Sequence, residues 1–540
     1  MCCKNFYNNI FCLLTKKIFC LLTILGVVVS ALSGVIPYFL GLLVNSVFYN
    51  SSIILYFLLF AFCALALVFL KKAYSYFIAN AAKFMTLKLQ EKYLNKIYSL
   101  PPSELERFPD GKLGLKFLRD IQNLTEFIKY FYPQLVEIVC GGAFSLILVF
   151  YTNFIIGLLF IFILPLSLFL IYPFYKAFGR INSLSRKNND NVFCRVFEIF
   201  YLLPFLKSIS AQDFYYHQSC AKLASIAKFS CISSVFDSNF NFFINLLFTV
   251  GELSVLGFSV YFAYNGTLKV GDVVFYQFIF TSTFNSFSNI YKMLPTWILI
   301  QESFVSLNEL DCLESEKSNQ NTFEFDGSVE LQNVTFCYDK TSKPILKNFS
   351  LIVNSGDIVF IKGKNGVGKT TLLKILCGSL SPKSGSAFFN GVNINDINLI
   401  AFRRKIAIVS QAFLLISDSI RNNITLHCND YTLEEINAVL DLVGLKPLID
   451  GFPKGLDEIV GNNGRKLSGG EIQKIAIARA LIRKPKLMIL DEITNHLDQE
   501  SQKSILKIIA LLRHKTTLIF VSHNCVEYFD FDKIVELKFD

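Results

Sequence analysis

Long apolar runs dominate the first 300 residues of the chain. Residues 18–45 and 53–70 contain no charged residue at all. Four further apolar runs follow, at 131–151, 154–175, 240–263 and 273–300. Because an α-helix of about 20 apolar residues crosses the hydrocarbon core of a bilayer, the pattern predicts about six membrane-spanning helices.

The first apolar run follows Lys16 and Lys17, an arrangement also found in cleaved secretory signal peptides. The apolar core of such a peptide has about 7–15 residues. The run at 18–45 is far longer, so it is interpreted as a membrane span.

The segments between the apolar runs differ in their content of Lys and Arg. The two long segments, after the second and fourth runs, are rich in both, whereas the short links at 46–52 and 152–153 have neither and 266–272 has only Lys269. Basic residues gather on the cytoplasmic side of membrane proteins. We therefore expect both long segments and both termini in the cytoplasm. Apolar positions at helical spacing between Phe84 and Ile97 predict that the spans continue there as helices.

The last apolar run is unusually polar. Its polar residues are Gln277, Thr281, Ser282, Thr283, Asn285, Ser286, Ser288, Asn289 and Lys292. Polar groups at membrane depth face protein or water, so this helix either lines a cavity or forms hydrogen bonds to other helices with no passage. Glu137 and Glu252 lie at or near membrane depth. Each either contacts a cationic substrate or pairs with a nearby Lys or Arg.

Composition agrees with a chain that is partly dissolved in lipid. The chain is 53% hydrophobic and only 17% charged, whereas soluble domains have about a quarter of charged residues. The basic cytoplasmic segments account for the net charge of +10. The charge therefore needs no explanation by nucleic-acid binding, which is not predicted. The 14 Cys form no CxxC pair and no regular ladder, so neither a disulfide framework nor a zinc site is predicted.

Composition changes at residues 311–327, which are polar and acidic. We therefore predict a membrane domain at 1–310, a linker at 311–327 and a second domain at 328–540. The predicted fold class is multi-domain. It combines an all-α polytopic membrane domain, whose helices extend into the cytoplasm, with an α/β domain that has a mostly parallel sheet.

A phosphate-binding loop is the first strong signal in the second domain. The G-x-x-x-x-G-K-[ST] pattern comprises Gly363, Lys364, Asn365, Gly366, Val367, Gly368, Lys369 and Thr370, followed by Thr371. An apolar strand pattern at 358–361 precedes it and a helical pattern at 371–376 follows, which is the context that the motif requires. Its backbone N–H groups are expected to bind phosphate oxygens. Lys369 is expected to reach the β- and γ-phosphates of a nucleotide, and Thr370 to bind Mg²⁺. The α/β domain with its mostly parallel sheet is therefore predicted to be a P-loop NTPase domain.

A second apolar strand pattern, at 487–490, ends in Asp491 and Glu492. An acid at the tip of a buried parallel strand, beside a phosphate loop, suits a hard cation. Asp491 is therefore a candidate Mg²⁺ ligand. Glu492 is a candidate for orienting or deprotonating the attacking water.

Residues 467–471, Leu-Ser-Gly-Gly-Glu, resemble the LSGGQ signature of ATP-binding cassette (ABC) proteins. In the family's order, Tyr338 matches the aromatic residue that stacks on adenine, and Gln411 matches the Q-loop residue that contacts the γ-phosphate and Mg²⁺. Residues 495–498 match the D-loop, and His523 matches the switch histidine. The resemblance implies that Ser468, Gly469 and Gly470 bind the ATP of a partner cassette.

The membrane half is similar in layout to exporter-type ABC half-transporters. Residues 100–102 with 108–111, and residues 211–213, resemble the two coupling regions of that family. Three positions depart from the family pattern: Glu471 in the signature, Asn462-Asn463 before it, and Asn495-His496 in the D-loop. These departures concern communication between cassettes, whereas the catalytic residues are all present.

The resemblance implies a dimer with ATP and Mg²⁺ at two composite sites, and a homodimer is preferred over a heterodimer because one chain holds all the catalytic parts. The expected function is ATP-driven export or flipping of a peptide, lipid or drug across the plasma membrane. An importer of siderophore-like substrates and a nucleotide-gated channel or regulator are the alternatives. The richness in Phe, Asn, Ile and Lys is typical of AT-rich bacterial genomes, which suggests the bacterial inner membrane.

Overall fold

The computed structural model describes residues 16–49, 52–108, 112–316, 323–338, 343–364, 366–410, 414–428, 430–461, 467–493, 506–522 and 530–537. They form two compact units, one of residues 1–100 and 106–314, the other of 101–105 and 315–540. We call them the helical unit and the cassette unit. The predicted fold class, helical membrane domain plus α/β domain, is confirmed.

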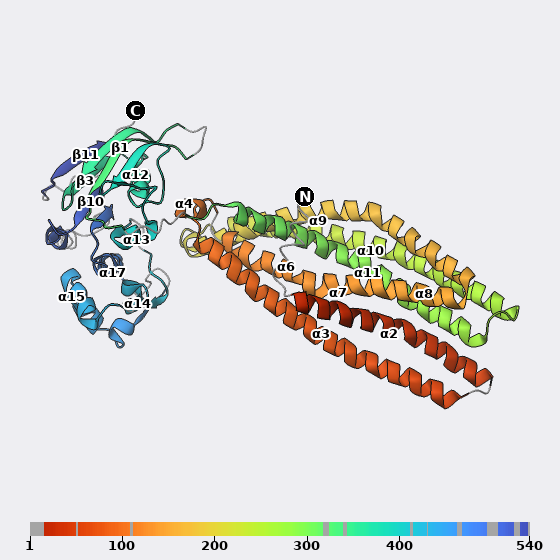
Figure 1. Ribbon diagram of the computed structural model, residues 1–540. Helices are drawn as coiled ribbons and strands as arrows, with labels where there is room; N and C mark the ends of the chain where they lie inside the picture. Colours follow the sequence, from red (N-terminus) through yellow and green to blue (C-terminus); the bar gives the residue numbers. More distant parts are fainter. Residues whose placement is uncertain are drawn as a thin grey trace. The chain divides into compact units, whose positions relative to one another are not determined.

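The helical unit consists of long helices that run alongside one another (Figure 1). They are α2 (Lys16–Phe48), α3 (Ile53–Tyr98), α9 (Phe154–Ser208), α10 (Gln212–Tyr264) and α11 (Val270–Cys312). A further helical path joins α5 (Lys112–Leu115), η1 (Lys116–Asp120), α6 (Ile121–Glu126), η2 (Phe127–Phe131), α7 (Tyr132–Val136), η3 (Glu137–Gly141) and α8 (Gly142–Thr152), with π-helical turns at η1, η2 and η3. With 55 residues in α9 and 53 in α10, the helices are far longer than a bilayer requires.

Within the described residues, four helices are long and apolar enough to cross a membrane. They cover Lys17–Phe48, Ile53–Tyr98, Lys116–Thr152 and Gln212–Tyr264, and contain the predicted spans at 18–45, 53–70, 131–151 and 240–263. The predicted span at 154–175 lies in α9, where the side chains of 162–176 are outside the described set. The span at 273–300 lies in α11, the helix with the polar residues.

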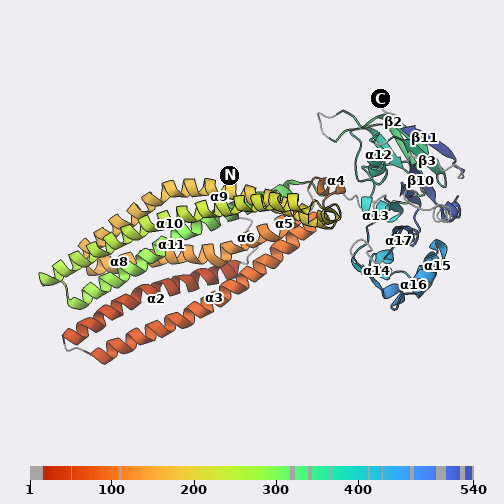
Figure 2. The ribbon, with the colours of Figure 1, turned by 180° about the vertical axis from the view of Figure 1, so that it is seen from behind.

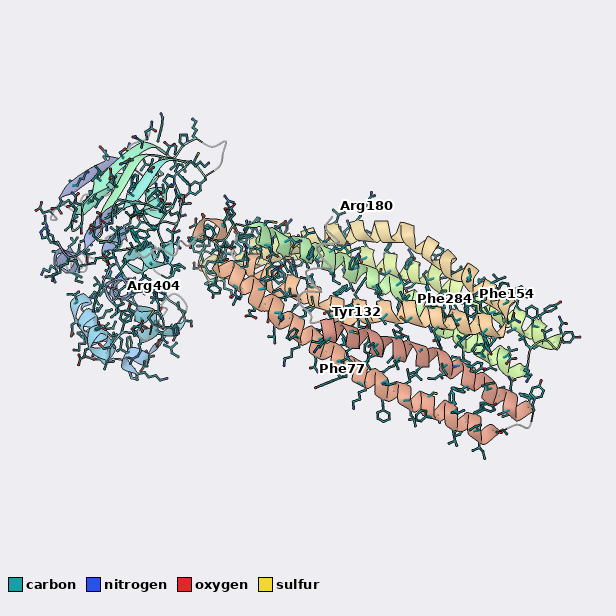
Figure 3. All side chains as sticks on the ribbon, viewed as in Figure 1. Phe77, Tyr132, Phe154, Arg180, Phe284 and Arg404 are labelled. Atoms are coloured by element: carbon teal, nitrogen blue, oxygen red, sulfur yellow. The ribbon has the colours of Figure 1, made fainter. Side chains whose placement is uncertain are left out.

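The outer side of α3 carries large apolar side chains that no other helix covers. Ile54, Phe62 and Phe69 are more than two-thirds exposed, and Phe77 stands off the same helix in Figure 3, whereas Tyr132 lies within the bundle. Exposed apolar surface of this extent is stable only in contact with lipid or another protein. The helical unit is therefore a membrane domain.

The cassette unit has a parallel sheet at its centre. Its strand order is β11 (Lys533–Leu537), β3 (Ile358–Gly363), β10 (Thr517–Ser522), β9 (Leu487–Asp491) and β6 (Ile406–Val409). Nearly every residue of β3, β9 and β10 is buried, because helices or a second sheet cover both faces. Val521 of β10 pairs with Asp491 of β9, and Ser522 with Lys362 of β3, so the carboxyl ends of three strands meet at one edge.

The second sheet is antiparallel, with the order β2 (Leu346–Val353), β1 (Val329–Phe336), β4 (Ser384–Phe389) and β5 (Val392–Asn393). A two-stranded sheet joins β7 (Asp418–Ser419) to β8 (Ile459–Val460). The helices are α12 (Lys369–Leu376), α13 (Leu399–Arg404), α14 (Ile420–Thr425), α15 (Leu433–Val443), α16 (Lys446–Asp450) and α17 (Gly469–Leu481), with a 3₁₀ turn at η4 (Gly455–Asp457). The short helix α4 (Pro102–Leu105) belongs to the same unit. Figure 2 shows these helices from behind.

Alternate residues of the parallel strands belong to different hydrophobic cores. Val359 and Ile361 of β3 pack in the core that includes α12 and the antiparallel sheet. Ile358 and Phe360 pack in the core that includes α14, α15 and α17. Since successive side chains of a strand point to opposite faces, α12 and α17 cover opposite faces of the parallel sheet.

Candidate functional site

The turn between β3 and α12 is built around two glycines with positive φ. Gly366 has φ +83° and Gly368 has φ +103°, conformations that favour glycine over other residues. A Cβ at Gly368 would also lie 2.7 Å from Ile345 Cγ2. The loop therefore takes the tight shape that lets backbone N–H groups face an anion at the start of a helix.

Lys369 is the first residue of α12, and its side chain is only 8% exposed. Its Nζ donates a hydrogen bond of 2.8 Å to the Gly363 carbonyl oxygen at the start of the loop. The same Nζ lies 3.6 Å from Glu492 Oε1. A buried ammonium group is thus held across the loop, next to a carboxylate that is also buried. Thr370 is exposed in the first turn of α12, and Thr371 beside it is buried.

Glu492 follows directly after β9 and adopts a left-handed backbone conformation, with φ +51°. Its N–H donates to the Val521 carbonyl oxygen of β10 at 2.8 Å. A non-glycine residue adopts such a backbone only where its surroundings fix it, and residues of this kind are frequent at active sites. Asp491 is half-buried at the end of β9, at the same strand edge.

Tyr338 lies beside the phosphate loop with an exposed ring. The ring is 47% exposed and packs edge-on against Phe336 at 5.2 Å between centroids. The Tyr338 hydroxyl and Thr371 Oγ1 are 3.4 Å apart. The exposed face of the ring is therefore free to stack on a planar base.

Ser468 caps the N-terminus of α17. Its Oγ accepts a hydrogen bond from the Glu471 N–H at 3.4 Å, and Glu471 Oε2 accepts one from the Ser468 N–H at 2.7 Å. This reciprocal capping box stabilises the first turn, and it gives the acidic residue at position 471 a structural role. Gly469 and Gly470 are the first two residues of the helix. Ser468 and Lys369 are thus carried by helices on opposite faces of the sheet.

Several candidate residues lie outside the described part of the chain. They are Asn365, Gln411 and His523, together with the segments 462–466 and 494–500 that contain the D-loop match and two departures from the family pattern. Among the residues that the structure describes, no group of three or more His, Cys, Asp or Glu gathers around a common point. A site for a resident metal held by protein alone is therefore not found there.

Two family models match this chain. An ABC transporter model matches residues 346–495, and an ABC transporter transmembrane region model matches 19–287. The chain belongs to the ABC transporters. Its two units correspond to the exporter-type arrangement of one membrane domain and one cassette, and ABC transporters of this half-size layout bind nucleotide, couple ATP hydrolysis to transport and work as dimers.

Relatives extend over most of the chain. It is 26% identical over 527 residues to the ATP-dependent lipid A-core flippase of Desulfotalea psychrophila, covering 95% of this chain and 90% of that protein. It is 28% identical over 390 residues to the putative multidrug export ATP-binding/permease protein YgaD of Bacillus subtilis, covering 69% and 67%. The solved structure of a bacterial Atm1-family ABC exporter with ATP bound has the same fold, with a TM-score of 0.82, 21% identity, and coverage of 96% and 92%.

The sequence did not single out two polar side chains of this ABC transporter, one of them buried and the other partly buried. Gln473 of α17 is 1% exposed and donates to the Ile493 carbonyl oxygen, next to Glu492. Arg403 of α13 donates to both carboxylate oxygens of Glu316, at 2.8 and 2.6 Å, and to the Gly378 carbonyl oxygen behind α12. A Gln in a helix and an Arg before a strand are also common at exposed positions. The sequence alone therefore does not show that these two side chains have such contacts.

Cys377 lies directly after α12 and is buried. Burial raises the pKa of its thiol to about 12, against a smaller opposite effect of Arg403. The thiol therefore stays neutral at physiological pH and packs as a small apolar group.

Glu252 of α10 is hydrogen-bonded to a neutral side chain that the sequence analysis had not considered as its partner. Its Oε1 accepts a 2.6 Å hydrogen bond from Gln277 Nε2 of α11, one of the polar residues of the last span. Glu137 lies in η3 with an exposed side chain. Thr281, Thr283 and Ser286 donate to carbonyl oxygens of their own helix. Four polar side chains of this span thus form hydrogen bonds within the unit.

Proposed function

We propose that the chain is the subunit of an ATP-driven exporter or flippase that moves a hydrophobic or amphipathic compound across the plasma membrane by alternating access. The observation that carries the proposal is the placement of Lys369 Nζ 3.6 Å from Glu492 Oε1, above a glycine loop at the strand edge. Phosphoryl transfer depends on such positioning and on charge neutralisation. The lipid A-core flippase and the multidrug export protein among the relatives favour a lipid or drug, with a peptide as the third class.

Each residue of the loop has a proposed role toward ATP. The backbone N–H groups of Gly363, Lys364, Asn365, Gly366, Val367, Gly368, Thr370 and Thr371 bind phosphate oxygens, and the Lys369 ammonium bridges the β- and γ-phosphates. The exposed ring of Tyr338 stacks on adenine. Glu492 orients and deprotonates the attacking water, while Gln411 and His523 contact the γ-phosphate end.

The side chains with oxygen ligands near the loop suit Mg²⁺. Mg²⁺ takes oxygen ligands, and in nucleotide sites it is held by one or two protein groups in addition to phosphate oxygens. Thr370 is exposed in the first turn of α12 and Asp491 is half-buried at the end of β9, so neither residue is fully buried. We assign these two residues, with Gln411, to the metal. Bound Mg²⁺ would neutralise charge on the phosphate oxygens.

The opposite placement of α12 and α17 supports a composite site. A nucleotide held by Lys369 on one face of the sheet is completed by Ser468, Gly469 and Gly470 of a second cassette, since α17 of the same cassette lies on the other face. One chain contributes both halves, so a homodimer holds two equivalent sites. A heterodimer with a related half-transporter is the other possible assembly.

In the membrane, both termini and both long helical hairpins lie on the cytoplasmic side, as the basic residues of those segments require. Residues 1–310 form the membrane domain, 311–327 the linker and 328–540 the cassette. Bacterial flippase and export relatives support the bacterial inner membrane as the location.

The test is Glu492→Gln in the full-length protein. We expect ATP binding to be retained, because Lys369 and the loop are unchanged, and hydrolysis and transport to be lost with the dimer held closed. Normal turnover in this variant would remove Glu492 from its role. Flux measured in sealed vesicles containing the parent protein distinguishes export from import, and flux that continues without hydrolysis would identify a channel instead.

A further inference from the structure

Gln473 is a buried amide on the helix that begins at the signature. Its side chain is 1% exposed, and the neighbouring Ile475 and Ile477 are also 1% exposed in the same hydrophobic core. An amide buried among apolar side chains is unfavourable unless it is hydrogen-bonded. Gln473 Nε2 meets that requirement by donating to the Ile493 carbonyl oxygen.

The carbonyl that Gln473 holds belongs to the residue after Glu492. The Glu492 backbone is therefore fixed on both sides, by the hydrogen bond from its own N–H to Val521 and by the one from Gln473 to Ile493. Its left-handed φ of +51° is unfavourable for a side-chain-bearing residue and persists only where such contacts determine it. Loss of either contact would let the peptide relax and move the carboxylate away from Lys369.

The same helix is tied at three points along its length. Ser468 caps its start, Gln473 holds the Glu492 loop, and Arg479 near its end donates to the carbonyl oxygens of Asn423 at 2.7 Å and Leu414 at 2.9 Å. Leu414 directly follows the segment that contains Gln411. These 13 residues thus form one continuous helix that joins the signature, the residue after Glu492 and the residue after the Gln411 segment.

We propose that Gln473 is a positioning residue for Glu492. Through Gln473, contact of the signature with the nucleotide held by the partner cassette would change the position of the Glu492 carboxylate in the same cassette as the signature. The proposal rests on the function given above. A nucleotide that contacts Ser468 shifts α17 or makes it more rigid. Because Gln473 of α17 is hydrogen-bonded to the Ile493 carbonyl oxygen, the Ile493 peptide follows this change, and the Glu492 side chain takes its catalytic position. Gln473 would therefore be one of the residues that couple hydrolysis at the two ATP sites of the dimer.

The experiment compares Gln473→Met and Gln473→Glu with the parent in the full-length transporter. Met keeps the volume without the donor, and Glu keeps the shape but places an acceptor against the Ile493 carbonyl. We expect kcat for ATP to fall about 10- to 100-fold, because small misplacement of a catalytic group has effects of that size. KM for ATP should stay within about twofold, because the phosphate contacts are unchanged. The Hill coefficient for ATP should fall toward one.

Ile475→Val is the matched control, since it removes one methyl group from the same core of the same helix and leaves the donor of the Gln473–Ile493 hydrogen bond in place. If Gln473 is only structural, its variants and Ile475→Val will show the same relation between melting temperature and kcat, and the proposal is wrong. If the Gln473 variants do not fold, Gln473→His, which retains a ring N–H donor, must restore folding and most of kcat, and failure of that rescue also counts against the proposal.

A double-mutant cycle separates this proposal from the assignment of Glu492. If Gln473 acts through Glu492, adding Gln473→Met to Glu492→Gln will lower residual hydrolysis no further. An additive loss would contradict the positioning role while leaving Glu492 as the catalytic residue. If Glu492→Gln alone keeps full turnover, the proposed function itself fails, whatever Gln473 does.

Discussion

The polar side chains of the two units have different kinds of hydrogen-bond partner. In the cassette unit, Lys369, Gln473 and Arg479 all donate to backbone carbonyl oxygens. In the helical unit, the contacts described between helices join side chain to side chain, as in Asn45–Asp272 and Gln277–Glu252. Hydroxyl groups such as Ser30 and Thr283 donate within their own helix instead.

The difference follows from where free backbone groups exist. Strand ends and turns of an α/β domain present carbonyl oxygens that a side chain can reach. Inside a membrane helix the backbone groups are already paired along the helix, so a polar contact between helices needs two side chains or a helix end. Two exceptions agree with this rule, because each involves an end of α11. The Gly271 N–H at its start donates to Asn45 Oδ1 at 2.7 Å, and Lys96 Nζ donates to the carbonyl oxygen of Leu313, directly after its end, at 2.6 Å.

The largest expected effect comes from Lys369→Ala in the cassette unit. Removing the ammonium deprives the phosphates of their cation and leaves Glu492 next to an empty position. Hydrolysis should fall by at least about 10²-fold, the size seen when one electrostatic donor is removed from an active site, and transport in vesicles should stop. Cargo movement at the parent's rate would refute the coupling of the cassette to transport.

In the helical unit, we expect a large loss of stability when a side chain is added at Gly271. An added Cβ would lie 2.6 Å from Asn45 Oδ1 and closer still to the Gly41 carbonyl oxygen, so α2 and α11 would have to separate. We expect Gly271→Ala to be destabilising at the upper end of about 1–3 kcal/mol, measured as the melting temperature of the full-length protein in detergent.

Gly257 of α10 provides the control for this change. A Cβ there would meet nothing within 4 Å, so Gly257→Ala should leave the melting temperature unchanged or raise it slightly, as better helix propensity predicts. Equal destabilisation by the two substitutions would mean that the close contact of α2 with α11 is not important for stability.

Glu252 tests whether the side-chain pairs of the membrane helices depend on charge. Glu252→Gln keeps an acceptor for Gln277 Nε2, so melting temperature and transport should both stay close to the parent's. Glu252→Leu removes the acceptor and should destabilise the protein by about 1 kcal/mol. Loss of transport in Glu252→Gln, with normal stability, would instead assign the charge to a cationic substrate.

The smallest effect concerns pH and the cassette unit. The pKa of Asp532 is held below its ordinary value, first because the Ile358 N–H donates to its carboxylate at 2.8 Å and also because Arg513 donates at 2.8 Å. A carboxylate with a lowered folded-state pKa stabilises the protein above the unfolded pKa of about 3.9, and this contribution is lost as the pH falls through the folded pKa.

Asp532→Asn should therefore make the melting temperature of the cassette transition less dependent on pH below about 4. The measurement is a series of melting curves from neutral to acidic pH, with the parent in parallel. If the melting temperature falls equally steeply with pH in both proteins, protonation of Asp532 does not affect the stability of the cassette unit.

Much of the site was predictable because its signals are local. The apolar strand pattern at 358–361, the glycine loop and the following helix are found as β3, the turn at Gly366 and Gly368, and α12. The capping role of Glu471 also had a local signal, because Ser468 and Glu471 have the S-x-x-E spacing of a capping box, but our sequence analysis treated Glu471 only as a replacement of the usual Gln. Glu252 was ambiguous, because its partner Gln277 lies 25 residues away on another helix.

The order of the apolar spans, the continuous apolar strands of the parallel sheet and the tight phosphate loop could all be predicted from the sequence alone. Each of these depends on interactions within a few residues or with the surrounding solvent. Only the tertiary structure decided which carbonyl Gln473 reaches, which carboxylate faces Lys369 and which helix Asn45 contacts. Such pairings depend on how distant segments pack, and the free energy of a polar contact exists only once both partners have been brought together.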